Sequence, residues 1–269
     1  MPAASGNLSV EAQVRYAYVE ALLASDFSPP AAVVELGSAP GDQIAHLSEI
    51  GYTATSVDLG EAPDAWGAGE DGRMRELLQR AGVAEVVWNL ENTPYPLADS
   101  SFDAVLMTEV YEHLREYPVL ALKEVHRILK PGGRLYFTTP NAAYLVTRFR
   151  ALIGRSSGSP LPDWIGGLPH ARHAREYTFA EMDLLMRTAG LEVVLRQSRH
   201  FHLTVGRSGA ATPLKRLLAL IARIRPTFGP EIVMVCERPA EAGSTPTPQA
   251  TKRTSRPTNT RRSRPARSG

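Results

Sequence analysis

Apolar positions along the chain form short runs that alternate with stretches in which apolar residues recur at helical spacing. Buried strands are predicted where the runs are short and continuous or alternate with polar residues: 33–36, 52–58, 83–88, 101–107, 134–139, 191–195 and 231–237. Amphipathic helices are predicted over 9–25, 43–47, 73–81, 117–129 and 179–189. Strands and helices that alternate in this way are typical of an α/β fold with a doubly wound, mostly parallel sheet.

The alternation is interrupted after Pro140-Asn141. A helix is predicted over 142–153, and a long loop rich in Gly and Pro over 154–174. Loops of this length in compact domains are usually functional lids or disordered segments, so we expect a lid insertion after the fifth strand. The predicted organisation is an N-terminal helical segment (1–30), one α/β domain (31–238) and a C-terminal tail (239–269).

Composition limits the class of protein. The chain has 269 residues, of which 43% are hydrophobic, enough for a substantial core. It contains no apolar run long enough for a transmembrane helix, and residues 1–6 lack the basic and apolar regions of a signal peptide. The single cysteine, Cys236, lies in an apolar run, which excludes an internal disulfide framework and predicts a buried thiol. These features together predict a cytoplasmic protein.

Charge is distributed unevenly along the chain. The formal net charge is +2, yet the segment from Pro239 onward holds seven basic residues and one acidic residue, so the remainder is net acidic. An acidic body argues against specific nucleic-acid binding. The tail is rich in Pro, Ser, Thr and Arg and has almost no large apolar residues, so we expect it to be disordered.

The first candidate ligand-binding residues lie at the end of the first predicted strand. Glu35 is followed by a glycine-rich turn from Gly37 to Gly41, and then by a helix. Glycines without a Cβ let the backbone approach a ligand closely, and the helix that follows offers backbone N–H groups to it. Asp58 ends the second strand 21 residues after Gly37, close to the spacing expected for an acid that binds ribose hydroxyls. The sequence therefore predicts a nucleotide-type cofactor site.

Several motifs follow one another in a specific order: Glu35-Leu36-Gly37-x-x-x-Gly41, Asp58, Pro94-Tyr95-Pro96 with Ser101-Phe102-Asp103, Glu112-His113-Leu114, Leu129-Lys130-Pro131-Gly132-Gly133 and Thr139-Pro140-Asn141. In this order they resemble the class I S-adenosylmethionine-dependent methyltransferases, over about residues 33 to 238. The resemblance implies seven strands, with the last strand antiparallel between the fifth and the sixth.

The resemblance also implies which residues contact the cofactor. In that family the glycine-rich turn holds the methionine part, the acid of strand two holds the ribose, and a residue at the end of strand three, usually Asp, holds the adenine. Here that last position is Asn89, an amide that can accept a hydrogen bond but carries no charge. The expected cofactor-binding residues are Glu35, Gly37, Ser38, Gly41, Asp58, Asn89, Leu90 and Thr108.

A second segment, from His173 to Thr178, resembles a His-x-Arg-Glu-Tyr-Thr motif of methyltransferases of the ubiquinone-biosynthesis type. This resemblance places His173 and Arg175 at the lip of a substrate pocket. The alternative is structural: Tyr177 and Thr178 would be the hydrophobic staple and the N-cap of the next helix.

The stretch after the fourth strand carries the candidate catalytic and metal-binding residues. If it turns helically, Glu109, Glu112 and His113 fall on one face. The pattern resembles the metal-binding stretch of ubiquinone-pathway O-methyltransferases and of small-RNA 2′-O-methyltransferases, in which a second histidine completes the site; His173 is the matching candidate. Mg²⁺, Mn²⁺ or Zn²⁺ would suit these ligands and could activate an acceptor hydroxyl. Without a metal, Glu112 and His113 would only cap a helix, and His113 or His173 could be a direct base.

The predicted function is transfer of a methyl group from S-adenosylmethionine to a hydroxyl of a small-molecule, sugar or lipid-linked glycan acceptor. One alternative is an NAD-dependent oxidoreductase, but Pro40 and Asp42 disturb the Gly-x-Gly-x-x-Gly pattern that such enzymes need. Another is a cofactor-binding scaffold without catalysis. A basic amphipathic helix predicted over 213–225 would either cap the substrate pocket with its apolar face or, helped by the basic tail, contact an anionic membrane surface.

Overall fold

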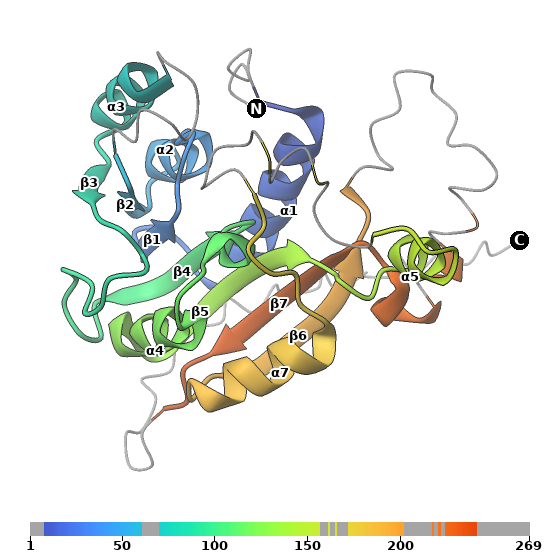
Figure 1. Ribbon diagram of the computed structural model, residues 1–269. Coiled ribbons are helices and arrows are strands. Elements are labelled where there is room, and N and C mark those ends of the chain that lie inside the picture. Colours follow the sequence, from blue (N-terminus) through green and yellow to red (C-terminus); the bar gives the residue numbers. More distant parts are fainter. Residues whose placement is uncertain are drawn as a thin grey trace, which may run out of the picture.

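The chain folds around one seven-stranded sheet, as seen in a computed structural model that describes residues 8–60, 70–156, 161, 165, 172–201, 217, 220, 221 and 224–240 (Figure 1). The strands are β1 (Ala32–Leu36), β2 (Thr53–Asp58), β3 (Ala84–Val87), β4 (Phe102–Thr108), β5 (Leu129–Pro140), β6 (Glu192–Arg199) and β7 (Glu231–Glu237). Their order is β3-β2-β1-β4-β5-β7-β6, and β7 is antiparallel to both of its neighbours. The expected topology is therefore confirmed.

Helices cover both faces of the sheet. They are α1 (Val10–Asp26), α2 (Asp42–Glu49), α3 (Glu70–Ala81), α4 (Pro118–Ile128), α5 (Leu145–Leu152) and α7 (Phe179–Thr188), with short 3-10 helices η1 (Tyr111–His113) and η3 (Pro226–Phe228). Successive strand residues point to opposite faces, so Val33 packs toward α1, α2 and α3 while Val34 packs toward α4 and α7. Each face has its own buried core, which is why the central strands read as continuous apolar runs.

Two element boundaries differ from the sequence-based prediction. Helix α3 begins at Glu70, ahead of its predicted start at residue 73. Strand β5 begins at Leu129, ahead of its predicted start at residue 134, because backbone bonds hold this segment to the end of β7: Gly132 N–H donates to Arg238, and Arg238 N–H donates to Gly133. A Cβ on Gly133 would lie 3.0 Å from the carbonyl oxygen of Asp103, so only glycine permits this close pairing.

Several predictions fall outside the described residues. They include most of the loop 154–174, the tail from residue 241 and most of the basic helix 213–225. At the described positions of that last segment, Leu217 and Ile224 are 52% and 73% exposed, so their side chains do not face a protein interior. Cys236 is buried, as expected. In the part of the chain that the structure describes, no helix is long and apolar enough to cross a membrane.

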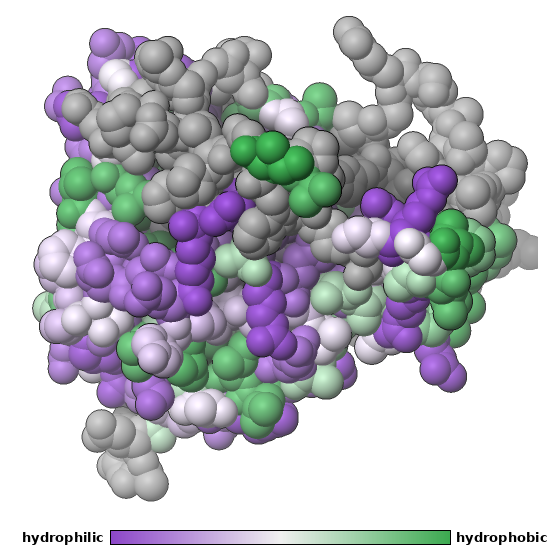
Figure 2. All heavy atoms as spheres, in the orientation of Figure 1, coloured by the Kyte–Doolittle hydropathy of each residue, from purple (hydrophilic) through white to green (hydrophobic). Residues whose placement is uncertain are grey.

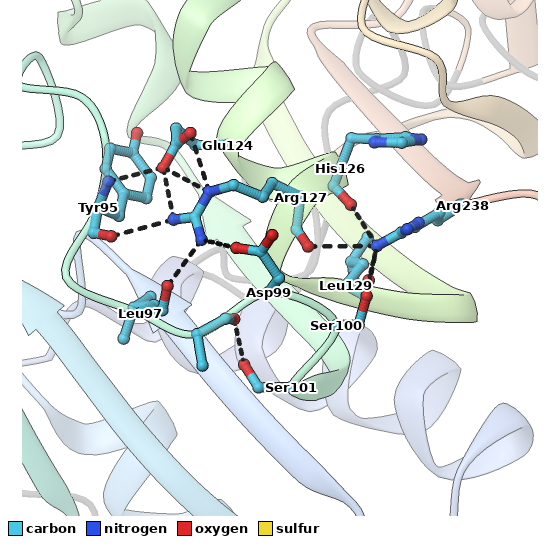
Figure 3. A network of polar contacts seen from close by, with 11 residues as sticks. Tyr95, Leu97, Asp99, Ser100, Ser101, Glu124, His126, Arg127, Leu129 and Arg238 are labelled. Atoms are coloured by element: carbon cyan, nitrogen blue, oxygen red, sulfur yellow. Dashed lines mark hydrogen bonds and ion pairs between the residues drawn. The ribbon is translucent and has the colours of Figure 1, made fainter.

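The loop between β3 and β4 is anchored by an arginine at the end of α4 (Figure 3). The Arg127 guanidinium donates to the carboxylates of Glu124 and Asp99 and to the carbonyl oxygens of Leu97 and Tyr95, at 2.5–3.0 Å. The Glu124 carboxylate in turn accepts from the backbone N–H of Tyr95 at 2.6 Å. This network fixes residues 95–99 of the loop. The first residues of the same loop, 88–91, line a cavity.

Candidate active site

A cavity of about 600 Å³ opens at the carboxyl ends of the central strands. It is lined by residues from α1, the β1–α2 turn, the ends of β2 and β4, and the loop after β3: Leu8, Ser9, Ala12, Arg15, Tyr16, Gly37, Ala39, Pro40, Asp58, Leu59, Met74, Trp88, Asn89, Leu90, Glu91, Thr108, Glu109, Val110, His113 and Leu114. This edge is where open α/β sheets bind their ligands. A cavity of this size accommodates a cofactor-sized molecule.

The glycine-rich turn forms one wall of the cavity. Gly37 has φ +73° and Gly41 has φ +90°, a region that glycine adopts without strain. A Cβ on Gly37 would lie 2.5 Å from a methyl carbon of Val110, so the turn packs directly against the segment after β4. Ser38 is buried, and its hydroxyl contacts that of Ser56 at 2.6 Å. Gly37 thus lines the cavity, whereas Ser38 and Gly41 belong to the turn but not to the cavity lining.

Asp58 lies at the centre of this wall. Its carboxylate accepts hydrogen bonds from the backbone N–H groups of Ala39, at 2.9 Å, and Leu59, at 2.7 Å. Because a carboxylate offers about four lone-pair sites, it can also accept bonds from a ligand. Asp58 therefore connects the end of β2 to the glycine-rich turn and faces the cavity.

Glu35, like Ser38, is a predicted cofactor residue that is buried beneath the cavity wall and does not line it. One of its carboxylate oxygens has no hydrogen-bond partner within the described part of the chain. Burial, together with the charge of Asp58, raises the pKa of the Glu35 carboxyl well above its usual range. The raised pKa favours the protonated carboxyl, which carries no charge in this buried position.

The remaining predicted cofactor residues, Asn89, Leu90 and Thr108, all line the cavity. The Asn89 side-chain oxygen accepts the backbone N–H of Glu91 at 2.9 Å, so this amide also shapes its own loop. The Thr108 hydroxyl faces the side-chain oxygen of Gln43 at 3.5 Å. Their positions agree with the expected cofactor site.

Helix α1 supplies a wall that the sequence did not reveal. Arg15 lines the cavity and lies among three carboxylates: 3.1 Å from Glu11, 3.2 Å from Glu231 and 3.8 Å from Glu109. Burial, with the charge of Glu109, raises the pKa of Glu231 to about 8. No local pattern could have found this cluster, because Arg15 and Glu231 are 216 positions apart in the chain.

Three of the four predicted metal ligands come together beside the cavity. Ligand atoms of Glu112, His113 and His173 all lie within 4.8 Å of one another, and the two imidazole rings meet edge to face at 5.1 Å. Glu112 is buried; Thr139 donates to one of its oxygens at 3.0 Å, while the other has no hydrogen-bond partner in the described structure.

Glu109 does not join this group, so the prediction of one helical face is wrong. Its backbone N–H still pairs with the carbonyl of Thr138 on β5, and its carboxylate accepts the Thr138 hydroxyl at 2.8 Å. Glu109 has φ +56°, and the helical turn that follows covers only Tyr111–His113. The left-handed residue therefore breaks the register that would have aligned Glu109 with Glu112 and His113.

The hydrogen bonds of the two histidines define the tautomer that each neutral ring adopts. The Nδ1 of His113 lies 3.1 Å from the carbonyl oxygen of Arg172, and the Nδ1 of His173 lies 3.0 Å from the Glu176 carboxylate. Both partners are acceptors, so in the neutral rings Nδ1 carries the proton and Nε2 carries the lone pair. This arrangement orients both rings as metal ligands or as proton acceptors.

The segment after His173 follows the structural alternative in part. Thr178 is the N-cap of α7 in a complete capping box with Glu181, and Tyr177 is buried. The Arg175 side chain is 62% exposed and pairs with Glu181 at 2.6 Å, outside the residues that line the cavity. Of this motif, His173 belongs to the candidate cluster and Glu176 contacts its ring.

Comparisons with known proteins agree with this geometry. A family model described as a methyltransferase domain matches residues 10–196. The ubiquinone/menaquinone biosynthesis C-methyltransferase UbiE of Rubrivivax gelatinosus is 31% identical over 67% of this chain and 72% of that protein. The ubiquinone biosynthesis O-methyltransferase of Pseudomonas entomophila is 29% identical over 60% of this chain and 64% of that protein. For other curated relatives the matched region covers only half of their length.

A solved structure with the same fold is the 1,6-didemethyltoxoflavin-N1-methyltransferase of Burkholderia thailandensis, which contains bound S-adenosylhomocysteine. It is 21% identical, the match covers 85% of this chain and 79% of that one, and the TM-score is 0.54. The family match removes the NAD-dependent oxidoreductase and the non-catalytic scaffold as alternatives. The chain belongs to the class I S-adenosylmethionine-dependent methyltransferases.

Proposed function

We propose that this enzyme methylates a hydroxyl group of a small-molecule, sugar or lipid-linked acceptor. The observation that carries the proposal is the cluster of Glu112, His113 and His173 at the edge of the cavity. A hydroxyl must lose its proton as it attacks the methyl group, and a neutral imidazole whose Nε2 holds a lone pair can accept that proton. One of the two ubiquinone-pathway relatives is named a C-methyltransferase and the other an O-methyltransferase, so the test must distinguish the two products.

Within the cavity, Asp58 would hold the ribose hydroxyls, Asn89 and Leu90 the adenine, and Gly37 the methionine part of S-adenosylmethionine. These positions run along one wall, from the loop after β3 to the glycine-rich turn. Glu35 is buried beneath this wall and would support the glycine-rich turn from the protein interior. The reacting methyl group would then face the segment after β4, which carries His113.

The same cluster fits a divalent cation, because a buried Glu112 oxygen has no hydrogen-bond partner in the described structure and lies 4.0 Å from His113 Nε2, while both imidazole Nδ1 atoms have acceptors. Glu112, His113 and His173 would be the ligands, and Glu109 would not. A bound Mg²⁺, Mn²⁺ or Zn²⁺ would lower the pKa of an acceptor hydroxyl. Two neighbouring hydroxyls, as in a catechol or a vicinal diol, suit such a site best.

The test is turnover with S-adenosylmethionine and a catechol, measured as S-adenosylhomocysteine formed, with NMR of the product to distinguish O-methyl from C-methyl. Glu112→Gln and His173→Ala should each lower turnover, while the control His46→Ala, outside the cavity, should not. The cation is tested separately. Metal content is measured after dialysis, and activity is measured in EDTA and again after each metal is added back. Transfer only to carbon would contradict the proposed chemistry. Full activity in EDTA would leave His113 or His173 as the base.

A further inference from the structure

Helix α5 is unusual among the helices of this protein because none of its residues is buried. Phe149, Leu152 and Ile153 are 61%, 84% and 53% exposed. They stand at positions i, i+3 and i+4, so they form one apolar stripe on the helix surface. A stripe of large apolar side chains on an exposed face indicates a surface that contacts another molecule.

The residues around this stripe are basic. Arg148, Arg150 and Arg155 lie on or next to α5, and residues 141–162 contain no acidic residue. Residues 200–230 also contain no acidic residue and hold five Lys and Arg. Since the chain without its tail is net acidic, these two segments are local basic regions on an acidic body.

Described residues of the two segments lie next to each other at two points. The Arg148 guanidinium stacks over the ring of Phe228 at 4.9 Å, and the Asn141 amide donates to the carbonyl oxygen of Thr227 at 3.0 Å. At the described positions before η3, Leu217, Leu220 and Ile224 expose more than half of their side chains. Figure 2 shows apolar and hydrophilic residues side by side on the surface where Figure 1 places α5.

This surface lies on the side of the sheet where the cavity opens. Strand β5 runs parallel to β4, with Thr138 paired to Thr108, and α5 begins shortly after β5 ends. A molecule that docks on α5 would therefore lie near the edge of the sheet from which an acceptor enters.

We propose that this surface, called here the α5 face (Phe149, Leu152, Ile153, Leu217, Leu220 and Ile224 with Arg148, Arg150, Arg155 and Arg225), docks onto an anionic phospholipid bilayer. Interleaved apolar and basic side chains match a bilayer interface, where apolar groups enter the acyl boundary and arginines contact phosphate groups. The docking is independent of which acceptor the enzyme methylates.

The test is co-sedimentation of the full-length protein with vesicles of phosphatidylcholine, alone or with about one third phosphatidylglycerol. We expect binding to the anionic vesicles, weakened by salt. Phe149→Ser with Leu152→Ser should reduce partitioning at least about tenfold. Arg150→Glu with Arg155→Glu should reduce it at least about twentyfold, since each charge near the surface contributes about fivefold.

Matched controls lie on another surface. Leu184→Ser replaces an apolar residue of α7 that is 60% exposed, and Arg187→Glu reverses an exposed charge on the same helix. Both should bind vesicles like the unaltered protein, and every variant should keep its affinity for S-adenosylhomocysteine. The proposal is overturned if the protein stays in the supernatant, or if the α5 variants sediment like the controls, in which case the basic tail accounts for binding. It is also overturned if the α5 substitutions change only the molecular mass in solution, because the face would then join two copies of the chain.

Discussion

Replacing Asp58 by alanine tests the cofactor site most directly. The carboxylate accepts hydrogen bonds from the N–H groups of Ala39, in the glycine-rich turn, and of Leu59, and Asp58 lines the cavity. Hydrogen bonds to a charged group contribute about 1.5–3 kcal/mol, so Asp58→Ala should raise the Kd for S-adenosylhomocysteine about 10- to 150-fold. Isothermal titration calorimetry measures this change.

A loss of affinity must be separated from a loss of folding. Asp103 is a matched control, because it also accepts a backbone N–H, that of Ala32 at 2.8 Å, and pairs with Lys130, but it does not line the cavity. Asp103→Ala should lower the free energy of unfolding by about 1–3 kcal/mol and leave the Kd unchanged. If Asp58→Ala binds S-adenosylhomocysteine as tightly as the unaltered protein, the assignment of the ribose site is wrong.

Three further predictions concern stability. Gly37→Ala should lower the free energy of unfolding by about 2–4 kcal/mol, because its Cβ would lie 2.5 Å from Val110 at φ +73°. Adding Val110→Ala should recover the steric part of this loss, measured by urea unfolding. Equal stabilities of the single and the double variant would refute this. Burial raises the pKa of Glu20 to about 7, so the folded state keeps a proton that the unfolded state loses, and stability should fall as pH rises from about 4.5 to 7. In the Glu20→Gln variant, the decrease in the free energy of unfolding between about pH 5 and pH 8 should be smaller by about 2–3 kcal/mol. An unchanged decrease would contradict this prediction. Arg127→Met should cost about 2–3 kcal/mol, because the Glu124 carboxylate loses its cationic partner and two carbonyl oxygens lose their donor, whereas the exposed Arg187→Met should cost little in the same assay.

The cofactor wall could be predicted from the sequence because its parts are short motifs at strand ends. Gly37, Asp58 and Asn89 each follow a strand, and parallel strands bring their carboxyl ends to one edge. The order of the strands then places them side by side without any knowledge of side-chain packing.

The other candidate site residues could be predicted only in part, for two physical reasons. A helical spacing was assumed for Glu109, but its backbone continues the ladder with Thr138 and then turns left-handed. The cluster around Arg15 depends on contacts between distant parts of the chain, which no local pattern records. The same limit applies to α5, since periodicity shows an apolar stripe but not whether a neighbour covers it.

The position of β7 determines the order in which this protein can be completed during synthesis. The last strand lies between β5 and β6, and its Glu231 is the partner of Arg15 on the first helix. The ribosome releases β1 to β5 first, so the cofactor wall can assemble while β6 still has no neighbour in the sheet. The ion pair between Arg15 and Glu231 must wait for residue 231. A nascent chain stopped before that point should be cut readily by proteases within 192–199.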